Sequence, residues 1–283
     1  MGYNFHFNKD SFRLFHTFRN TVFRFFIGFI TLCLVYPSKL RLADKKQKWY
    51  FIGAGLCGVT LYFLLENIAL THTLASNVGV IISIAPFFTA IFAHLFLTSE
   101  NFKMNFFIGF IAAFIGIFLI SFNGNTNFHL NPIGDILAIL AAIVWAIYSI
   151  LMKKITEFQY NTIQTTRRIF FYGLLFMIPT LFILDFNLGL ERFTYIPNLL
   201  NILFLGLGAS ALCFVTWNFA VKMLGAIKTS IYIYLVPVIT VVTSMIVLNE
   251  KITTLAVLGT ILTLVGLLIS ELKFNPKKKD SHL

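Results

Sequence analysis

The sequence predicts an all-α integral membrane protein with nine transmembrane helices, on three observations. Of its 283 residues, 58% are hydrophobic and only 12% are charged, whereas a soluble domain is roughly a quarter charged. Apolar runs near the roughly 20 residues that cross a bilayer recur along the whole chain. Runs such as ILAILAAIVWAIYSIL (136–151) do not alternate apolar and polar residues, as the strands of a membrane barrel would.

The predicted spans are separated by short polar segments that leave no room for a soluble domain. In chain order the spans are Thr21 to Tyr36, Trp49 to Leu70, Ala75 to Leu97, Asn105 to Phe122, Ile133 to Leu151, Ile169 to Leu184, Leu199 to Val221, Ile227 to Leu248 and Leu255 to Leu272. Catalytic or regulatory chemistry would therefore lie inside the helix bundle or on short loops. The three cysteines lie in apolar runs without a CxxC pair, so we interpret them as packing residues.

The net charge of +11 follows the membrane topology of the chain rather than a groove for nucleic acid. If the loop after the first span is cytoplasmic, sixteen lysines and arginines fall on the cytoplasmic side, against only Arg192 and Lys251 in the loops of the other side. Because basic residues concentrate in cytoplasmic loops, the tail KFNPKKKDSHL (273–283) is predicted to be cytoplasmic. The expected location is a bacterial plasma membrane. The expected partners are a small-molecule substrate and membrane lipid, with no nucleic acid, and a homodimer is left open.

The chain contains an internal repeat. A shift of 151 residues superposes Asn67 on Asn218 and Pro86 on Pro237. A shift of 150 superposes three further pairs: Glu100 on Glu250, Gly109 on Gly259 and Gly116 on Gly266. A unit of five helices is odd, so the second copy enters the membrane from the opposite side, as in the inverted repeats of many transporters. Gly109 and Gly116 lie seven residues apart, as do Gly259 and Gly266. Each such pair shares one helix face and predicts close helix packing.

Four stretches in fixed order resemble the EamA-type drug/metabolite transporters. They are Pro86 with Glu100, Pro237 with Glu250, GDILAILAAIVWAIYSILMKK (134–154) and LGLGASALCFVTWNFAVKMLGA (205–226). The resemblance runs from about Phe23 to Leu272 and implies ten helices in two five-helix repeats. It also implies alternating-access transport of small organic metabolites, such as amino acids or related compounds, with export as the expected direction.

An intramembrane enzyme, such as a lipid transferase or a protease, is the alternative function. It would need clustered ionisable groups, and no HExxH, DDxxD-like or paired His and Asp motif lies in or beside a predicted span. The sequence therefore predicts a protein that is not an enzyme, with no cofactor and no metal site.

The predicted organisation departs from the family pattern at the N-terminus. It consists of a polar segment (1–20), a first repeat of four helices (21–122), a second repeat of five helices (133–272) and a basic tail (273–283). The repeat partner of the span at Ile133 would be the family's first helix, which is not found. Without that helix, four basic residues would lie on the outer side, against the charge rule: Lys9, Arg13, Arg19 and Arg24.

Two hypotheses address this departure. One is that the sequence as given begins late, so that a first helix precedes it. The other is that residues 1–20 form an amphipathic helix at the membrane interface, with Phe12, Phe15 and Phe18 on one stripe.

Pro86 and Pro237 each lie near the middle of a span, hence near the bilayer midplane. A proline removes one backbone hydrogen bond and frees the carbonyl four residues earlier, which should face a polar cavity or a neighbouring helix. Nearby hydroxyl groups are candidate substrate contacts: Ser83, Tyr232 and Tyr234. The alternative is a kink that only shapes packing.

Glu66 is the only carboxylate well inside a predicted span. It lies about one turn from the outer end of that span, so its side chain can reach the interface, because a charge at the bilayer centre costs about 2.5–3.5 kcal/mol or more. A proton- or cation-coupling site is the other interpretation. Five further residues are candidates for the wall of a substrate cavity, with helix contacts or interface anchoring as the alternative: Asn67, Trp145, Tyr148, Trp217 and Asn218.

Overall fold

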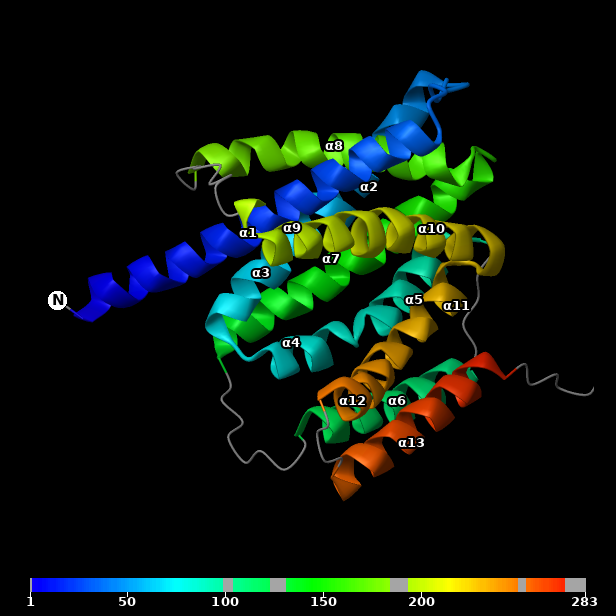
Figure 1. The fold of residues 1–283 in the computed structure, drawn as a ribbon. Helices are drawn as coiled ribbons and strands as arrows, with labels where there is room; N and C mark the ends of the chain where they lie inside the picture. The colour runs from blue at the N-terminus through cyan, green and yellow to red at the C-terminus, as the bar shows by residue number, and fades with distance from the viewer. Residues whose placement is uncertain (1, 99–103, 123–130, 184–192, 249–252, 273–283) are drawn as a thin grey trace, which may run out of the picture.

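The computed structural model describes residues 2–98, 104–122, 131–183, 193–248 and 253–272, and the regular elements in these ranges are all helices (Figure 1). The longer ones are α1 (Gly2–Val35), α2 (Lys48–Gly55), α3 (Tyr62–His72), α4 (Ala75–Ile82), α5 (Ala85–Phe96), α6 (Met104–Phe122), α7 (Pro132–Glu157), α8 (Thr162–Ile183), α9 (Ile196–Phe204), α10 (Cys213–Leu224), α11 (Ala226–Ile231), α12 (Leu235–Leu248) and α13 (Thr254–Glu271). Short helices η1 (Lys45–Gln47), η2 (Leu56–Leu61), η4 (Leu205–Leu212) and η5 (Tyr232–Tyr234) join some of them. The all-α prediction is confirmed.

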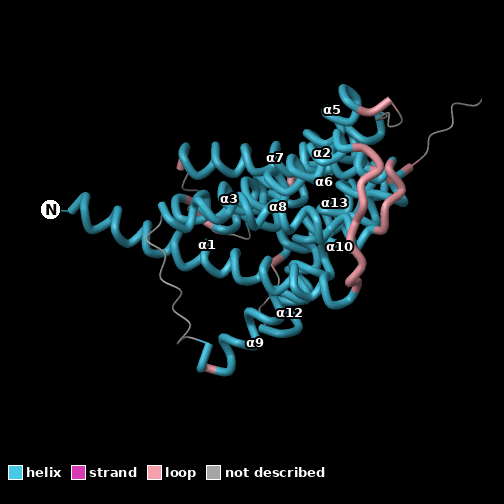
Figure 2. Tube along the Cα trace, turned by 90° about the horizontal axis from the view of Figure 1, so that it is seen from above, coloured by secondary structure: helices cyan, strands magenta, loops and turns pink. Residues whose placement is uncertain are grey.

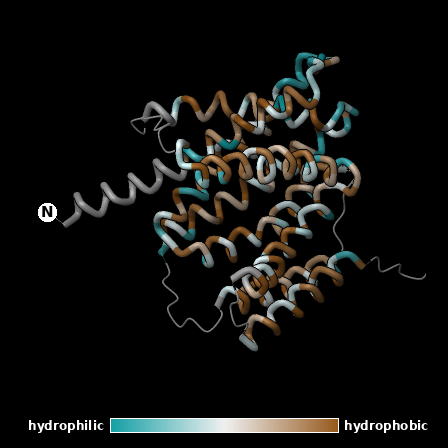
Figure 3. The backbone as a smooth tube through the Cα atoms, in the orientation of Figure 1, coloured by the Kyte–Doolittle hydropathy of each residue, from teal (hydrophilic) through white to brown (hydrophobic). Residues whose placement is uncertain are grey.

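In the described ranges, eight helical stretches are long and apolar enough to cross a membrane. They correspond to eight of the nine predicted spans. The remaining span, Ile169 to Leu184, falls in α8, which is 22 residues long but begins with the polar sequence TIQTTRR (162–168). Figure 3 shows brown, apolar stretches along the middle of the helices and teal, polar stretches near their ends.

The first helix is longer than its predicted span. α1 is continuous from Gly2, and the stretch of it that can span a membrane begins at Phe18. Figures 1 and 2 show its N-terminal part projecting beyond the other helices.

Two membrane-length helices contain a π-helical segment at matching places in the repeat. In one, η2 joins α2 to α3, and in the other η4 joins α9 to α10. The two run in opposite directions in Figure 1, as inverted repeats would. A π-bulge inserts an extra residue into a helical turn and is common at functional sites. The sequence analysis did not predict these segments.

The prolines interrupt their helices as predicted. α4 ends at Ile82 and α5 begins at Ala85, with Pro86 in its first turn. At the break the backbone tightens: Ser83 N donates to Val80 O at 3.1 Å and Ile84 N to Ile81 O at 3.0 Å. In the second repeat the three-residue 3₁₀-helix η5 stands at the matching place, before Pro237 in α12. Both interruptions therefore lie inside a membrane-spanning stretch.

α6 and α13 pack together through their glycines. A Cβ atom at Gly116 would lie 2.6 Å from Gly259 O, and one at Gly259 would lie 2.6 Å from Gly116 O. A Cβ atom at Gly266 would lie 2.6 Å from Gly109 O. The backbones meet where no side chain fits, so the close packing predicted from these glycines is confirmed.

The buried apolar side chains form two large clusters. One gathers residues of α1, α2, α7, α8 and α10 around Phe25, Tyr148 and Phe170. The other gathers residues of α5, α6, α7, α11 and η5 around Ile117, Ile150 and Tyr234. α7 contributes to both clusters and so connects the two parts of the bundle.

Candidate functional site

Four helices bring aromatic and charged side chains together inside the bundle, in the part where α1, α3, α7 and α10 lie (Figure 1). We call the following eight residues the central cluster: Arg24 from α1, Tyr62, Phe63 and Glu66 from α3, Trp145 and Tyr148 from α7, and Phe214 and Trp217 from α10. Phe63 and Phe214 are 151 residues apart, and each stands at the start of the helix that follows a π-helical segment. Both repeats thus contribute to one site.

Trp145 is the centre of the aromatic packing. Its ring centroid lies 4.8 Å from that of Tyr62, 5.2 Å from Tyr148, 5.3 Å from Trp217 and 6.0 Å from Phe214. Aromatic pairs at such distances add about 0.5–1.5 kcal/mol each beyond the area that they bury. The cluster therefore has a rigid aromatic wall made from three helices.

Two asparagines fasten this wall to the neighbouring helices in the same way in both repeats. Asn67 Nδ2 donates to Thr21 Oγ1 at 3.1 Å, and Asn218 Nδ2 donates to Thr166 Oγ1 at 2.9 Å. Asn218 Oδ1 also accepts from the hydroxyl of Tyr148 at 2.6 Å. Asn218 is fully buried with both ends of its amide engaged, as expected of a polar side chain that holds helices together.

The site contains one cation and one carboxylate. The guanidinium of Arg24 lies 4.3 Å from the ring centroid of Phe63 and 5.1 Å from that of Phe25. Glu66 Oε1 accepts from the hydroxyl of Tyr62 at 3.3 Å. The charges of Arg24 and Glu66 act on each other, but no direct ion pair joins them in the described structure. Each charge alone inside a membrane would cost about 2.5–3.5 kcal/mol or more.

Three hydrogen-bond donors in the cluster are buried without an acceptor in the described ranges: Arg24 Nε, Trp145 Nε1 and Trp217 Nε1. Indole and guanidinium groups can only donate. A buried donor without an acceptor costs about 1–3 kcal/mol. Their grouping means that the cluster can take an anionic or carbonyl group on one side, while Glu66 can take a cation.

The structure brings together six of the sequence-predicted site residues: Glu66, Asn67, Trp145, Tyr148, Trp217 and Asn218. The other five belong to the two helix interruptions. Ser83 is buried and its hydroxyl donates to Val80 O at 2.5 Å. Tyr234 is fully buried in the second core cluster, whereas Tyr232 is 41% exposed. Pro86 is buried and Pro237 is half-buried.

Arg24 is the functional candidate that the sequence analysis missed. The charge rule assigned it to the outer side, but it lies within α1 and packs on Phe63 and Phe25. A signal was available, because Arg24 interrupts an otherwise apolar run from Val22 to Ile30. Thr21 and Thr166 had no comparable signal, since a threonine in a membrane helix is common.

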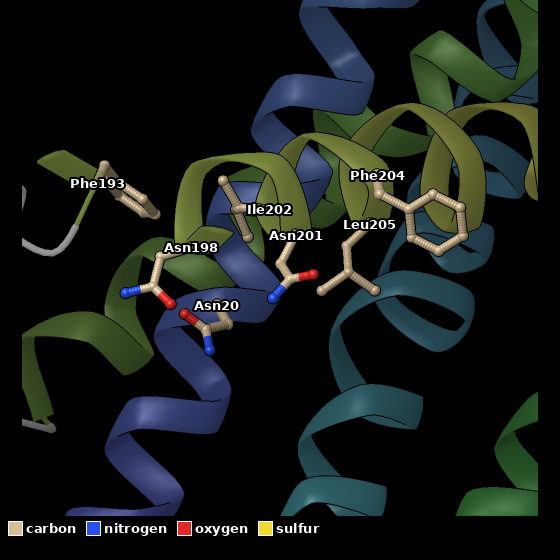
Figure 4. A pocket seen from close by; sticks show the side chains of 7 residues that line it. All are labelled: Asn20, Phe193, Asn198, Asn201, Ile202, Phe204 and Leu205. Atoms are coloured by element: carbon tan, nitrogen blue, oxygen red, sulfur yellow. The ribbon is translucent and has the colours of Figure 1, made fainter. Parts of the chain in front are cut away.

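A surface pocket of about 400 Å³ opens between α1 and α9 (Figure 4). Its lining residues are Asn20, Phe193, Asn198, Asn201, Ile202, Phe204 and Leu205. Asn20 lies four residues before Arg24, so the two side chains project from the same face of α1 on successive turns. The pocket therefore adjoins the turn of α1 that carries Arg24.

Across the described ranges, no group of three His, Cys, Asp or Glu side chains lies close enough together to hold a metal ion. In the central cluster, the one carboxylate is Glu66.

Comparison with known proteins places the chain among transporters. It is 26% identical over 234 residues to an uncharacterized transporter of Archaeoglobus fulgidus, covering 80% of this chain and 78% of that protein. It is 27% identical over 260 residues to the uncharacterized transporter YvbV of Bacillus subtilis, covering 90% and 82%. A protein of Streptantibioticus cattleyicolor named probable terminal-alkyne amino-acid exporter is 27% identical over 215 residues, covering 76% and 70%.

A solved crystal structure has the same fold, with a TM-score of 0.72 at 18% identity over 90% of this chain and 88% of that one. The sequence profile of the EamA-like transporter family matches residues 1–122 and again 132–272, which together make up most of the chain. The two matches divide the chain where the sequence repeat divides it, and the chain belongs to the EamA-like transporter family.

Proposed function

We propose that this chain is a secondary transporter that exports a small organic metabolite of the amino-acid type across the bacterial plasma membrane by alternating access. The observation that carries the proposal is the meeting of the two repeats at the central cluster. Helices with matching π-helical segments supply Phe63 and Phe214, and matching Asn–Thr hydrogen bonds hold them in place. A site placed between two repeats can be opened to either face by rocking one repeat against the other.

The interruptions at Pro86 and Pro237 supply the bending points that such a motion needs. Both lie inside membrane-spanning stretches, and a broken helix can change its angle without breaking a continuous ladder of hydrogen bonds. The intramembrane enzyme considered as the alternative gains no support, since the described part of the cluster offers one carboxylate and no nucleophile paired with a base.

Amino acids as substrates are supported by one relative, which is named as a probable exporter of a terminal-alkyne amino acid. The test is transport by the purified full chain in liposomes preloaded with a panel of unlabelled metabolites, followed by addition of each labelled compound. Counterflow accumulation of at least one compound is expected. Inertness toward the whole panel, with correctly folded protein in both orientations, would overturn the proposal.

The coupling hypothesis for Glu66 also stays a proposal. Glu66 faces Arg24 and Tyr62, so two roles are open to its carboxylate: loading a proton, or binding the cationic end of the substrate. The pH profile of a Glu66 variant separates the two roles.

A further inference from the structure

We propose that Arg24 and Glu66 form the two poles of a binding site for a zwitterionic α-amino acid with an uncharged side chain. Arg24 and the two indole N–H groups take the carboxylate, and Glu66 takes the ammonium group. This inference rests on the proposed transport function and names the substrate class of the central cluster.

The positive pole is built for a planar anion. Cation–π contacts with Phe63 at 4.3 Å and with Phe25 at 5.1 Å hold the Arg24 guanidinium between two rings. The buried Nε has no acceptor among the described residues, so at least one N–H group of the guanidinium is unpaired. A carboxylate fits such an edge through two parallel hydrogen bonds, a geometry that lysine cannot offer.

Two indole groups of the central cluster also have an unpaired donor. Trp145 Nε1 and Trp217 Nε1 are also buried without an acceptor in the described structure, and their rings are 5.3 Å apart. Three donors of this kind in one cluster, and no acceptor that serves them, point to an oxygen-rich group that is supplied by the substrate. A carboxylate has four lone-pair positions and can satisfy several donors at once.

The negative pole is Glu66. Its hydrogen bond in the described structure uses Oε1, which accepts from Tyr62. The second oxygen is thus available to an ammonium group. Phe63 and Glu66 are three residues apart on α3 and share one face of that helix, so the carboxylate lies on the side of α3 where Arg24 stacks.

A hydrogen bond outside the site joins the two helices that carry the poles. Thr21 is three residues before Arg24, and Asn67 follows Glu66; Asn67 Nδ2 donates to Thr21 Oγ1 at 3.1 Å. This bond fixes α1 against α3. The result is two opposite charges that act on each other without forming a direct ion pair. A zwitterion can span them with each end beside its opposite charge, which removes both uncompensated charges at once.

The remaining wall selects the side chain of the substrate. Tyr148, Phe214 and the ring faces of the two tryptophans are apolar, and a charged substrate side chain would stand there without a partner. The surface pocket at Asn20, one helical turn from Arg24, is lined by three side-chain amides: Asn20, Asn198 and Asn201.

The test measures binding directly, by tryptophan fluorescence of the full chain in detergent. Trp49 is 72% exposed and outside the site, so Trp49→Phe leaves only the two site tryptophans as reporters. The probes are L-phenylalanine and L-leucine, together with their N-acetyl derivatives, which lack the ammonium, and their amides, which lack the carboxylate. We expect a saturable change for at least one free amino acid and affinities roughly 10- to 100-fold weaker for either modified form, as for one lost charged hydrogen bond.

Variants then assign each end. Arg24→Gln should bind the free amino acid roughly 10- to 100-fold more weakly, and should bind the free amino acid and its amide equally well. Glu66→Gln should bind the free amino acid and its N-acetyl form equally well. Arg24→Lys, which keeps the charge and is the milder change, should give an intermediate loss. The controls are Arg41→Gln in an exposed loop and Glu157→Gln at the exposed end of α7, both of which should bind as the parent does.

The outcomes separate the two proposals. Transport of amino acids with no difference between Arg24 or Glu66 variants and their controls would overturn the two-pole site and leave the transport function standing. Transport of other metabolites, with no fluorescence response to any free amino acid, would overturn the substrate class alone. Inertness toward every compound in both assays would overturn the transport function and this inference together.

Discussion

Asn218 donates to Thr166 across 2.9 Å, and the same amide accepts from Tyr148 at 2.6 Å. Its repeat partner Asn67 makes the corresponding bond to Thr21 at 3.1 Å, but no helix supplies it with an equivalent of Tyr148 in the described structure. The two asparagines thus have the same place in the repeat and different numbers of partners.

Replacing Asn218 by alanine should therefore destabilise the protein more than replacing Asn67. The change at Asn218 removes two hydrogen bonds and leaves the buried Tyr148 hydroxyl without its acceptor, while the Thr166 hydroxyl still donates to Thr162 O at 2.8 Å. It should cost about 2–3 kcal/mol, whereas the change at Asn67, which removes one hydrogen bond, should cost about 1 kcal/mol. Thermal unfolding in detergent measures the difference. Asn201→Ala, at an exposed position of the pocket rim, is the control and should melt as the parent does. Equal losses at Asn67 and Asn218 would contradict this account.

Enlarging Gly116 should separate α6 from α13. A Cβ atom there would lie 2.6 Å from a backbone oxygen, which a neighbouring helix cannot relieve by a side-chain rotation. Gly116→Ala should cost about 1–3 kcal/mol, seen as a lower melting temperature and lower abundance in the membrane. Gly79→Ala is the matched control, because a Cβ atom at Gly79 would meet nothing within 4 Å and alanine is the better helix former. An equal loss of stability there would show that the contact with α13 does not cause the effect.

Much of this fold could be predicted from the sequence because it depends on local composition. Length and hydropathy predict the spans, Pro86 and Pro237 predict the interruptions, and Gly116 predicts a close helix contact. The contact of Arg24 with the α3 face that carries Phe63 and Glu66 could not be predicted, because it depends on helix register. Each extra residue in a helical turn rotates the rest of the helix by about 100°, so the π-helical segment Leu56–Leu61 decides which face of α3 carries Glu66.

The hydrogen-bond partners of the predicted site residues could not be predicted either. Asn67 and Asn218 were recognised as matching positions, and both lie at the central cluster, but their threonine partners come from helices without any marked sequence signal. Glu100 and Glu250, which helped to identify the repeat, lie outside the described residues.

Replacing Pro86 by alanine should slow transport more than it lowers the amount of protein in the membrane. The 3₁₀-type bonds at Ser83 and Ile84 show that the backbone is already tightened there, and an alanine would let α4 and α5 join into one stiff helix. A several-fold lower initial rate at unchanged abundance is expected, in the counterflow assay. Pro179→Ala, inside α8 and away from the interruptions, is the control. Normal rates in both Pro86→Ala and Pro237→Ala would reduce the kinks to packing features.

A reporter enzyme that is active only outside the cytoplasm should stay silent when it is fused after Leu283. The distribution of basic residues predicts that the tail at 273–283 is cytoplasmic. The same reporter inserted after Asn131, at the other end of α7 from the cytoplasmic loops, should be active and serves as the positive control. An active fusion at Leu283 would reverse the topology and, with it, the direction proposed for transport.

The pH profile of Glu66→Gln decides between the two roles of that carboxylate. If Glu66 loads a proton, removing its charge should abolish the pH dependence of uptake while exchange of substrate continues, because exchange needs no net proton movement. If Glu66 holds the ammonium group of the substrate, the variant should bind the substrate roughly 10- to 100-fold more weakly across the whole pH range in which the ammonium stays charged, and whatever pH dependence the parent shows should persist.

The charged and titratable groups around Glu66 are Arg24 and Tyr62, with Cys213 beside Arg24. Because Tyr62 contacts Glu66 and Cys213 lies beside Arg24, Tyr62→Phe and Cys213→Ser are measured alongside. We expect weaker binding with a retained profile; loss of the profile together with intact affinity would assign Glu66 to coupling and remove the negative pole from the proposed site.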